Sequence, residues 1–156
     1  MIVRHLYISP DHNYFGHHGK PAGQSPALPV ESVELVAGKG IVGDRFFGYK
    51  EDYKGQVTFF SLETYKRLCD TFDVDDKDPS TFRRNIIVEG ADLPALIGQQ
   101  LQVGEITFLG TCESSPCYWM DQAFHPGAED ALRGHGGLRA KVLTSGTLKI
   151  GDTSPS

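Results

Sequence analysis

The sequence lacks the long apolar run that a membrane-spanning helix requires. None of its hydrophobic stretches approaches the roughly 20 consecutive apolar residues that cross a bilayer, so we expect no membrane segment. The N-terminal stretch Met-Ile-Val-Arg-His also lacks the apolar core of a signal peptide. Together these two absences favour a cytoplasmic location.

Basic residues are too few for a general nucleic-acid-binding surface. The 156-residue chain has 15 Lys and Arg against 20 Asp and Glu, a formal net charge of −5, whereas binding to nucleic-acid phosphates needs a strongly basic face. Local clusters of arginine suffice for a small anion, so a small anionic cofactor or substrate is the expected partner. Cysteine is scarce as well: three cysteines without the regular spacing of a disulfide framework predict reduced thiols.

Short apolar segments divided by turn residues indicate the fold class. The 18 glycines and 9 prolines punctuate segments that favour strands, and the chain length suits one domain. We therefore predict a mostly β chain of the α+β class that forms a single domain over residues 1–156. The expected strands are 2–9, 33–36, 57–60, 85–88, 100–103, 105–109, 138–143 and 147–150, the last two forming a pair linked through glycine.

Helices are expected to be few and short. From Ser61, a plausible N-cap, apolar residues recur at helical spacing, and this spacing places Cys69 on the core face. Two further short helices are expected at 119–124 and 126–133, and a helical turn or tight loop at 92–98.

Residues 11–29 form a segment rich in histidine, glycine and proline, with no regular periodicity. Loops longer than about 12–15 residues in a compact domain are usually functional or disordered. His12, His17 and His18 carry imidazoles, common ligands of zinc and iron, although their spacing fits no recognised ligand pattern. Two hypotheses stay open: a metal site on these histidines, or a loop within residues 1–30 that covers a neighbouring site.

Cys117 is the candidate reactive residue. It lies in Thr-Cys-Glu-Ser-Ser-Pro-Cys-Tyr-Trp-Met (111–120), among polar and turn-forming residues that follow an expected strand. A thiolate serves as a nucleophile, a persulfide carrier or a ligand of a soft metal. Cys69 instead fits a small buried hydrophobe, and Cys112 with Cys117 makes a poor zinc pair because no second pair accompanies it.

Three arginine-bearing segments supply positive charge elsewhere in the chain. They are Gly43-Asp44-Arg45, Arg83-Arg84-Asn85-Ile86 and Gly136-Gly137-Leu138-Arg139-Ala140. A guanidinium group can bind a phosphate or a carboxylate through two parallel hydrogen bonds. Because successive side chains of a strand point to opposite faces, one arginine of the second segment is expected to point into a site. Taken alone, the pair Arg83-Arg84 is better explained by solvated or ion-paired side chains, and the same caution covers Arg139. Asp44 is equally explained by a capped turn.

Taken together and in order, these segments resemble the MOSC domain, the module named for the C-terminal part of molybdenum cofactor sulfurases. The resemblance covers most of the chain, at residues 40–45, 83–86, 90, 96–98, 115–117, 136–140 and 146–152. It implies a compact β-barrel with a few short peripheral helices. It also implies a cleft where Cys117 meets a molybdenum–pterin cofactor or carries sulfur for it, and where Arg83 and Asn85 contact the phosphate region, with Ser115 near the thiol.

We therefore predict a protein that binds the molybdenum–pterin cofactor or carries sulfur for it. Cys117 would be the molybdenum ligand or the persulfide carrier, and the anion pocket would be formed by Arg45, Arg83, Asn85, Ser115 and Arg139. A cysteine desulfurase or a molybdoenzyme is the expected protein partner. Whether the protein is an enzyme stays open, with sulfur transfer or molybdenum-dependent redox chemistry as the expected reactions.

Two alternatives belong to other functional classes. The first is a zinc- or iron-dependent small-molecule enzyme that uses the N-terminal histidine loop, with Asp11 or Asp44 as base. The second is a non-catalytic adaptor that delivers the cofactor to a partner through an exposed Tyr118-Trp119-Met120 patch. For Trp119 the favoured interpretation is an ordinary core residue, because tryptophans are highly buried on average.

Overall fold

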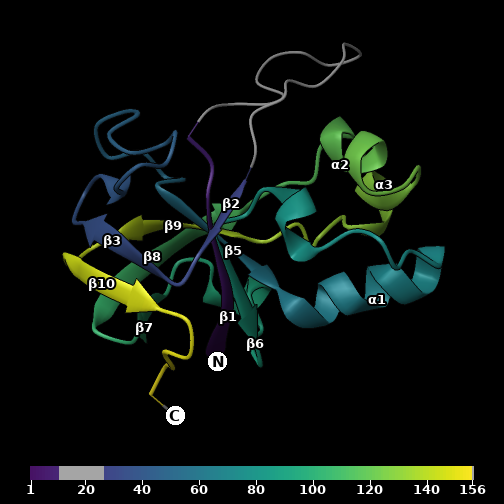
Figure 1. Ribbon diagram of the computed structural model, residues 1–156. Coiled ribbons are helices and arrows are strands. Elements are labelled where there is room, and N and C mark those ends of the chain that lie inside the picture. The colour runs from purple at the N-terminus through teal and green to yellow at the C-terminus, as the bar shows by residue number, and fades with distance from the viewer. Residues whose placement is uncertain (11–26, 156) are drawn as a thin grey trace.

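Strands dominate the fold. The computed structural model describes residues 1–10 and 27–155, which form a seven-stranded sheet and a three-stranded sheet together with three short α-helices (Figure 1). The mostly β, α+β class predicted from the sequence is thus confirmed. In this part of the chain, no helix has both the length and the apolar character needed to cross a membrane.

The larger sheet has the order β2-β1-β6-β5-β9-β8-β7. All neighbouring strands in it are antiparallel except β5 and β6, which are parallel because a helix connects them. Its strands are β1 (Ile2–Ile8), β2 (Leu28–Val30), β5 (Val57–Ser61), β6 (Ile86–Glu89), β7 (Gln100–Val103), β8 (Ile106–Glu113) and β9 (Leu138–Val142).

The smaller sheet covers one face of the larger one and lies on the left in Figure 1. Its order is β10-β3-β4, with β3 (Ser32–Val36), β4 (Gly40–Ile41) and β10 (Gly146–Lys149). The predicted pairing of the last two strands is wrong: β9 pairs with β5 and β8, whereas β10 pairs with β3. A short link in the sequence does not specify whether the chain stays in one sheet, and here it changes sheet.

The helices cover the opposite face of the larger sheet, on the right in Figure 1. They are α1 (Leu62–Phe72), α2 (Tyr118–Ala123) and α3 (Ala128–Ala131), with 3-10 turns at Pro79–Phe82 and Pro94–Leu96. α1 begins as predicted, because the Ser61 hydroxyl accepts a hydrogen bond from the Thr64 amide at 3.2 Å. Cys69 packs against the core beneath the helices, as its helical spacing predicted.

Successive side chains of the central strands point to opposite faces of the sheet and so fill two separate cores. Phe59 lies in the core between the two sheets, whereas its neighbour Phe60 lies in the core under the helices. Ile86 and Ile87 of β6 divide in the same way. Both faces of these strands are therefore buried, which explains why each reads as a continuous apolar run.

The predicted barrel is not confirmed. The larger sheet ends at β2 on one side and at β7 on the other, and no pairing joins these two strands within residues 1–10 and 27–155. Barrel closure depends on the tilt and stagger of strands that are distant in the sequence. The spacing of apolar segments carries no information about either quantity.

The contribution of the Ser61 N-cap to stability can be tested at the point where β5 ends and α1 begins. Replacing Ser61 with Ala removes the acceptor of the Thr64 amide, and we expect the free energy of unfolding to fall by about 0.5–2 kcal/mol. Urea denaturation would measure this loss. Ser61→Thr retains the hydroxyl, so its free energy of unfolding should stay close to that of wild type. Equal losses in both variants would contradict a capping role.

Candidate functional site

Five predicted site residues meet at one cavity of about 200 Å³, which we call the arginine cavity. They are Arg45, Arg83, Ser115, Cys117 and Arg139. The remaining lining residues are Phe46, Tyr53, Gly55, Thr58, Arg84 and Ser114, so that, among the residues the structure describes, four arginines and no acidic side chain face this space. The sequence segments that carry positive charge therefore converge on the candidate thiol.

Strand pairing and tight turns bring these side chains together. Arg139 of β9 is the register partner of Thr58 of β5, so both side chains lie on the same face of the sheet. A Cβ atom at Gly55 would lie 3.2 Å from Cδ of Arg139. The glycine thus leaves room for the aliphatic stem of this arginine, and Cys117 approaches from the N-terminal end of α2.

A buried carboxylate lies beneath the arginine cavity. Asp44 is 5% exposed, and its Oδ1 accepts hydrogen bonds from the Ser9 amide at 3.0 Å and from Nδ2 of Asn85 at 3.1 Å. Its Oδ2 accepts from the Phe46 amide at 3.2 Å. Both oxygens are therefore occupied by donors from three separate segments, an arrangement that suits a structural anchor and argues against the predicted alternative of Asp44 as a free base.

Asn85 extends the same buried network. Its Oδ1 accepts from the Thr58 amide at 3.1 Å and from the Thr58 hydroxyl at 3.2 Å. Its Nδ2 donates to the Tyr7 carbonyl at 3.2 Å in addition to Asp44. All the polar groups of the side chain are used within the protein, and Asn85 lies outside the cavity lining. Direct contact between Asn85 and a ligand stays a prediction.

Arg45 brings a charged group with incomplete pairing to the cavity wall. Its Nη1 lies 3.5 Å from Asp44 Oδ1, but the geometry is not that of a hydrogen bond, and this buried nitrogen has no hydrogen-bond partner among the described residues. The guanidinium also lies 4.6 Å from the centre of the Phe46 ring. Burial lowers the pKa of Arg45, and the Asp44 carboxylate partly opposes this effect.

Both Arg83 and Arg84 line the cavity, although strand alternation predicts that only one of them does. The reason is the backbone: Arg83 has φ of +57°, in the left-handed region, and ends the 3-10 turn before β6 begins. Alternation applies only inside a strand. Burial, followed by the charge of Arg45, lowers the pKa of Arg83 to about 10, a value that still leaves it positively charged at neutral pH.

Arg84 is a site residue that the sequence did not single out. Its Nε donates to the Gly136 carbonyl at 2.9 Å, and its Nη2 donates to the Ser114 and Ser115 carbonyls at 3.0 and 3.3 Å. None of these acceptors carries a charge. Burial lowers the pKa of Arg84 to about 10, and the nearby Cys117 opposes this effect. Arg84 thus ties the Cys117 loop to the segment before β9 while keeping its positive charge.

Cys117 is the most accessible thiol of the chain. It is exposed, whereas Cys69 and Cys112 are only partly exposed, and all three are free. Cys112 lies within β8 as the register partner of Arg139. An exposed thiol on the wall of a cationic cavity can attack an electrophile, carry a sulfur atom or bind a soft metal.

The alternative histidine metal site falls on residues that the structure does not describe. His12, His17, His18 and Asp11 lie outside the described residues, so the histidine metal site is not tested. Within residues 1–10 and 27–155, no group of three or more His, Cys, Asp or Glu side chains could hold a metal ion.

The predicted Tyr118-Trp119-Met120 patch is not an exposed surface. Met120 is 1% exposed, and Trp119 packs against the core under the helices while its Nε1 donates to the Thr81 carbonyl at 2.7 Å. Trp119 and Met120 thus pack against the core instead of forming the expected exposed patch, and the adaptor role itself stays a prediction.

Comparisons with known proteins agree with this architecture. The family model of the MOSC domain matches residues 16–154. YuaD from Bacillus subtilis has a similar structure, with a TM-score of 0.74 at 19% identity over 97% of this chain and 92% of that one. YiiM from Geobacillus stearothermophilus gives 0.70 at 12% identity over 99% and 75%, and YiiM from Escherichia coli gives 0.66 at 17% over 100% and 70%. No curated protein matches the sequence.

The buried network makes a prediction about Asn85. Replacing it with Ala leaves the Thr58 amide without its acceptor and removes one donor from Asp44. We expect the free energy of unfolding to fall by about 2–4 kcal/mol, measured by denaturant titration. Ser115→Ala, a change at an exposed residue of the arginine cavity that takes no part in the network, should stay within about 0.5 kcal/mol of wild type. A fully stable Asn85→Ala protein would mean that the network does not anchor the site.

Proposed function

Because the chain belongs to the MOSC domain family, we propose that it handles the molybdenum–pterin cofactor through Cys117, either as a ligand of molybdenum or as a carrier of its sulfur. One observation carries this proposal: an exposed thiol lies on the wall of a cavity that four arginines and no described acidic side chain line. The cofactor supplies a thiophilic metal held by a pterin that bears a phosphate.

The charges of the arginine cavity fit the anionic end of such a molecule. Arg45 presents a buried nitrogen that lacks a hydrogen-bond partner among the described residues, and Arg139 makes no ion pair with any of them. Guanidinium groups bind phosphate bidentately. The Ser115 hydroxyl at the same wall adds a neutral donor.

The size of the arginine cavity limits which part of the ligand it receives. Its volume of about 200 Å³ is below the roughly 300–1,000 Å³ of pockets that enclose a whole drug-sized molecule. We therefore assign to it the anionic portion of the ligand only. The exposed side of Cys117 is then where the reacting sulfur or metal meets solvent and partner.

In the carrier role, Cys117 would receive sulfur from a separate protein. The Cys117 thiolate attacks the outer sulfur of a persulfide on a cysteine desulfurase, a new S–S bond forms on Cys117, and the desulfurase thiolate leaves. The transfer moves one neutral sulfur atom and needs no further oxidant or reductant. The exposure of Cys117 suits this exchange between two proteins, and a cysteine desulfurase or a molybdoenzyme is the proposed partner.

Elemental and pterin analysis tests the proposed function directly. Protein purified from a cofactor-producing host should contain molybdenum and oxidised pterin in equal amounts if Cys117 is a ligand, and Cys117→Ala should lose both. If Cys117 is a carrier, incubation with a desulfurase and cysteine should add one sulfur by mass spectrometry, absent from Cys117→Ser. The proposal would be ruled out if the protein contained no molybdenum and Cys117 acquired no sulfur adduct.

The anion pocket makes a separate prediction. Arg139→Gln removes a guanidinium that lines the cavity, and we expect phosphate binding, measured by calorimetry, to weaken roughly tenfold because a charge-assisted pair is lost. Lys141→Gln is the matched control, since it removes the same charge from the same strand outside the cavity lining. Equal weakening in both variants would indicate a general charge effect instead of a built site.

A further inference from the structure

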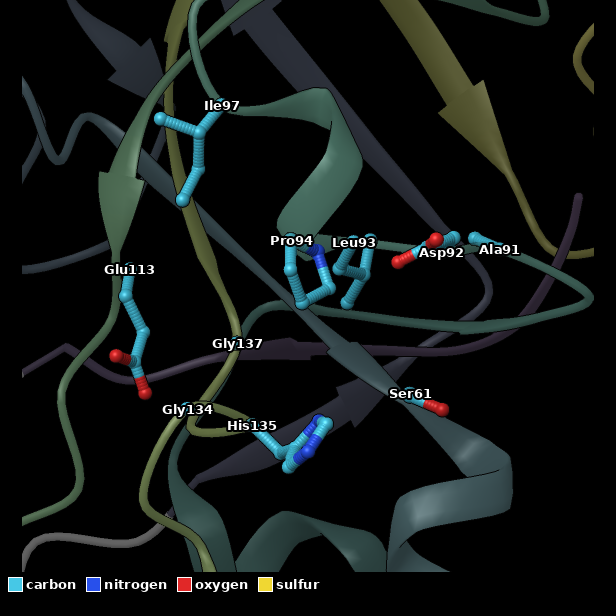
Figure 2. Close-up of a pocket in the computed structure, with 10 residues that line it drawn as sticks. All are labelled: Ser61, Ala91, Asp92, Leu93, Pro94, Ile97, Glu113, Gly134, His135 and Gly137. Carbon is cyan, nitrogen blue, oxygen red and sulfur yellow. The ribbon is translucent and has the colours of Figure 1, made fainter.

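A second cavity, of about 350 Å³, is larger than the arginine cavity, and its lining residues are drawn in Figure 2. Its sides are the segment 91–97 that follows β6 and the segment 134–137 that precedes β9. Ser61 and Glu113, at the ends of β5 and β8, complete it. We call it the acidic cavity, and none of its lining residues lines the arginine cavity.

Apolar atoms make up most of the lining of the acidic cavity. Leu93 is 4% exposed and belongs to the core between the sheets, while Pro94 and Ile97 are exposed at the edge. In Figure 2 the His135 ring projects into the space facing Leu93 and Pro94. A volume within the range of roughly 300–1,000 Å³, apolar walls and a few polar groups are the usual features of a small-molecule site.

Two carboxylates line this space, and the buried Arg84 behind Gly137 offsets part of the charge of one of them, Glu113. Asp92 and Glu113 are its two carboxylates, and Figure 2 shows them on opposite sides of Leu93 and Pro94. Neither forms an ion pair with another described residue, and no lysine or arginine is part of the described lining. Glu113 is held in place because its Oε2 accepts from the Gly136 amide at 3.1 Å.

We propose that the acidic cavity is a binding site for a small organic cation, with an apolar body and a protonated amine. The apolar body would pack between Leu93, Pro94 and the His135 ring, and the ammonium would lie near Glu113 or Asp92. This proposal is independent of the function proposed for Cys117. It gives the protein two neighbouring sites of opposite charge preference.

The wall between the two cavities provides a physical link. Arg84 donates to the Gly136 carbonyl and to the Ser114 carbonyl, and these residues adjoin the His135 and Glu113 that line the acidic cavity. The same arginine lines the arginine cavity beside Cys117. A molecule bound in the acidic cavity therefore contacts segments that are directly hydrogen-bonded to a residue of the other site.

Titration of the full chain with phenethylamine, followed by amide NMR, tests the proposal. Hydrocinnamate is the matched probe, because it has the same ring and a similar length with the opposite charge. We expect phenethylamine to shift the amides of residues 91–97 and 134–137 in a saturable manner and to bind at least about tenfold more tightly than hydrocinnamate. No saturable shift in these segments, or equal affinities for the two probes, would overturn the proposal.

Two kinds of variant locate the site. Ala91→Phe places a ring in the acidic cavity and should abolish phenethylamine binding, whereas Ala95→Phe, at an exposed position of the same segment outside the lining, should leave it unchanged. Asp92→Asn combined with Glu113→Gln keeps the shapes and the Gly136 acceptor, and should remove most of the preference for the cation. Unchanged charge preference in this double variant would overturn the proposal even if Ala91→Phe failed to fold.

Discussion

The hydrogen bond between Asp44 and Asn85 is the interaction on which the site depends. A buried carboxylate is strongly destabilising unless several donors compensate for its lost hydration, and Asp44 finds these donors on Ser9, Phe46 and Asn85. The end of β1, the turn after β4 and the entry to β6 are thereby held together. Arg45 and the 83–84 pair occupy adjacent positions as a consequence, because each directly neighbours a member of this network.

Bringing four guanidinium groups together opposes folding. Burial and the mutual repulsion of the arginines lower the pKa of Arg83 and of Arg84 to about 10, so the charged forms are less favourable here than in water. Both nevertheless stay protonated at neutral pH, since 10 is well above 7. The two apolar cores stabilise the fold, whereas the cavity retains an unfavourable positive potential. Binding of an anion relieves that potential, which is a physical reason to expect one.

The sequence predicted the parts of the structure that local patterns specify. Short apolar segments bounded by turn residues located the central strands, the hydroxyl of Ser61 located the start of α1, and the resemblance brought Arg45, Arg139 and Cys117 to one site. It did not predict that both Arg83 and Arg84 line the cavity, because that follows from the left-handed backbone of Arg83. Nor did it predict the acidic cavity or the change of sheet at β10, which depend on packing between distant segments.

Packing also distinguishes residues that the fold requires from residues that only the proposed chemistry requires. A Cβ at Gly136 would lie 2.3 Å from the Ser114 carbonyl oxygen, and one at Gly137 would lie 2.4 Å from the Phe59 carbonyl oxygen. These two glycines are therefore required by the fold, whatever the protein binds. Cys117 is exposed, and Arg139 makes no ion pair with a described residue, so stability does not explain their presence. A chain that kept the glycines and lost Cys117 and Arg139 would retain this architecture without the chemistry proposed for it.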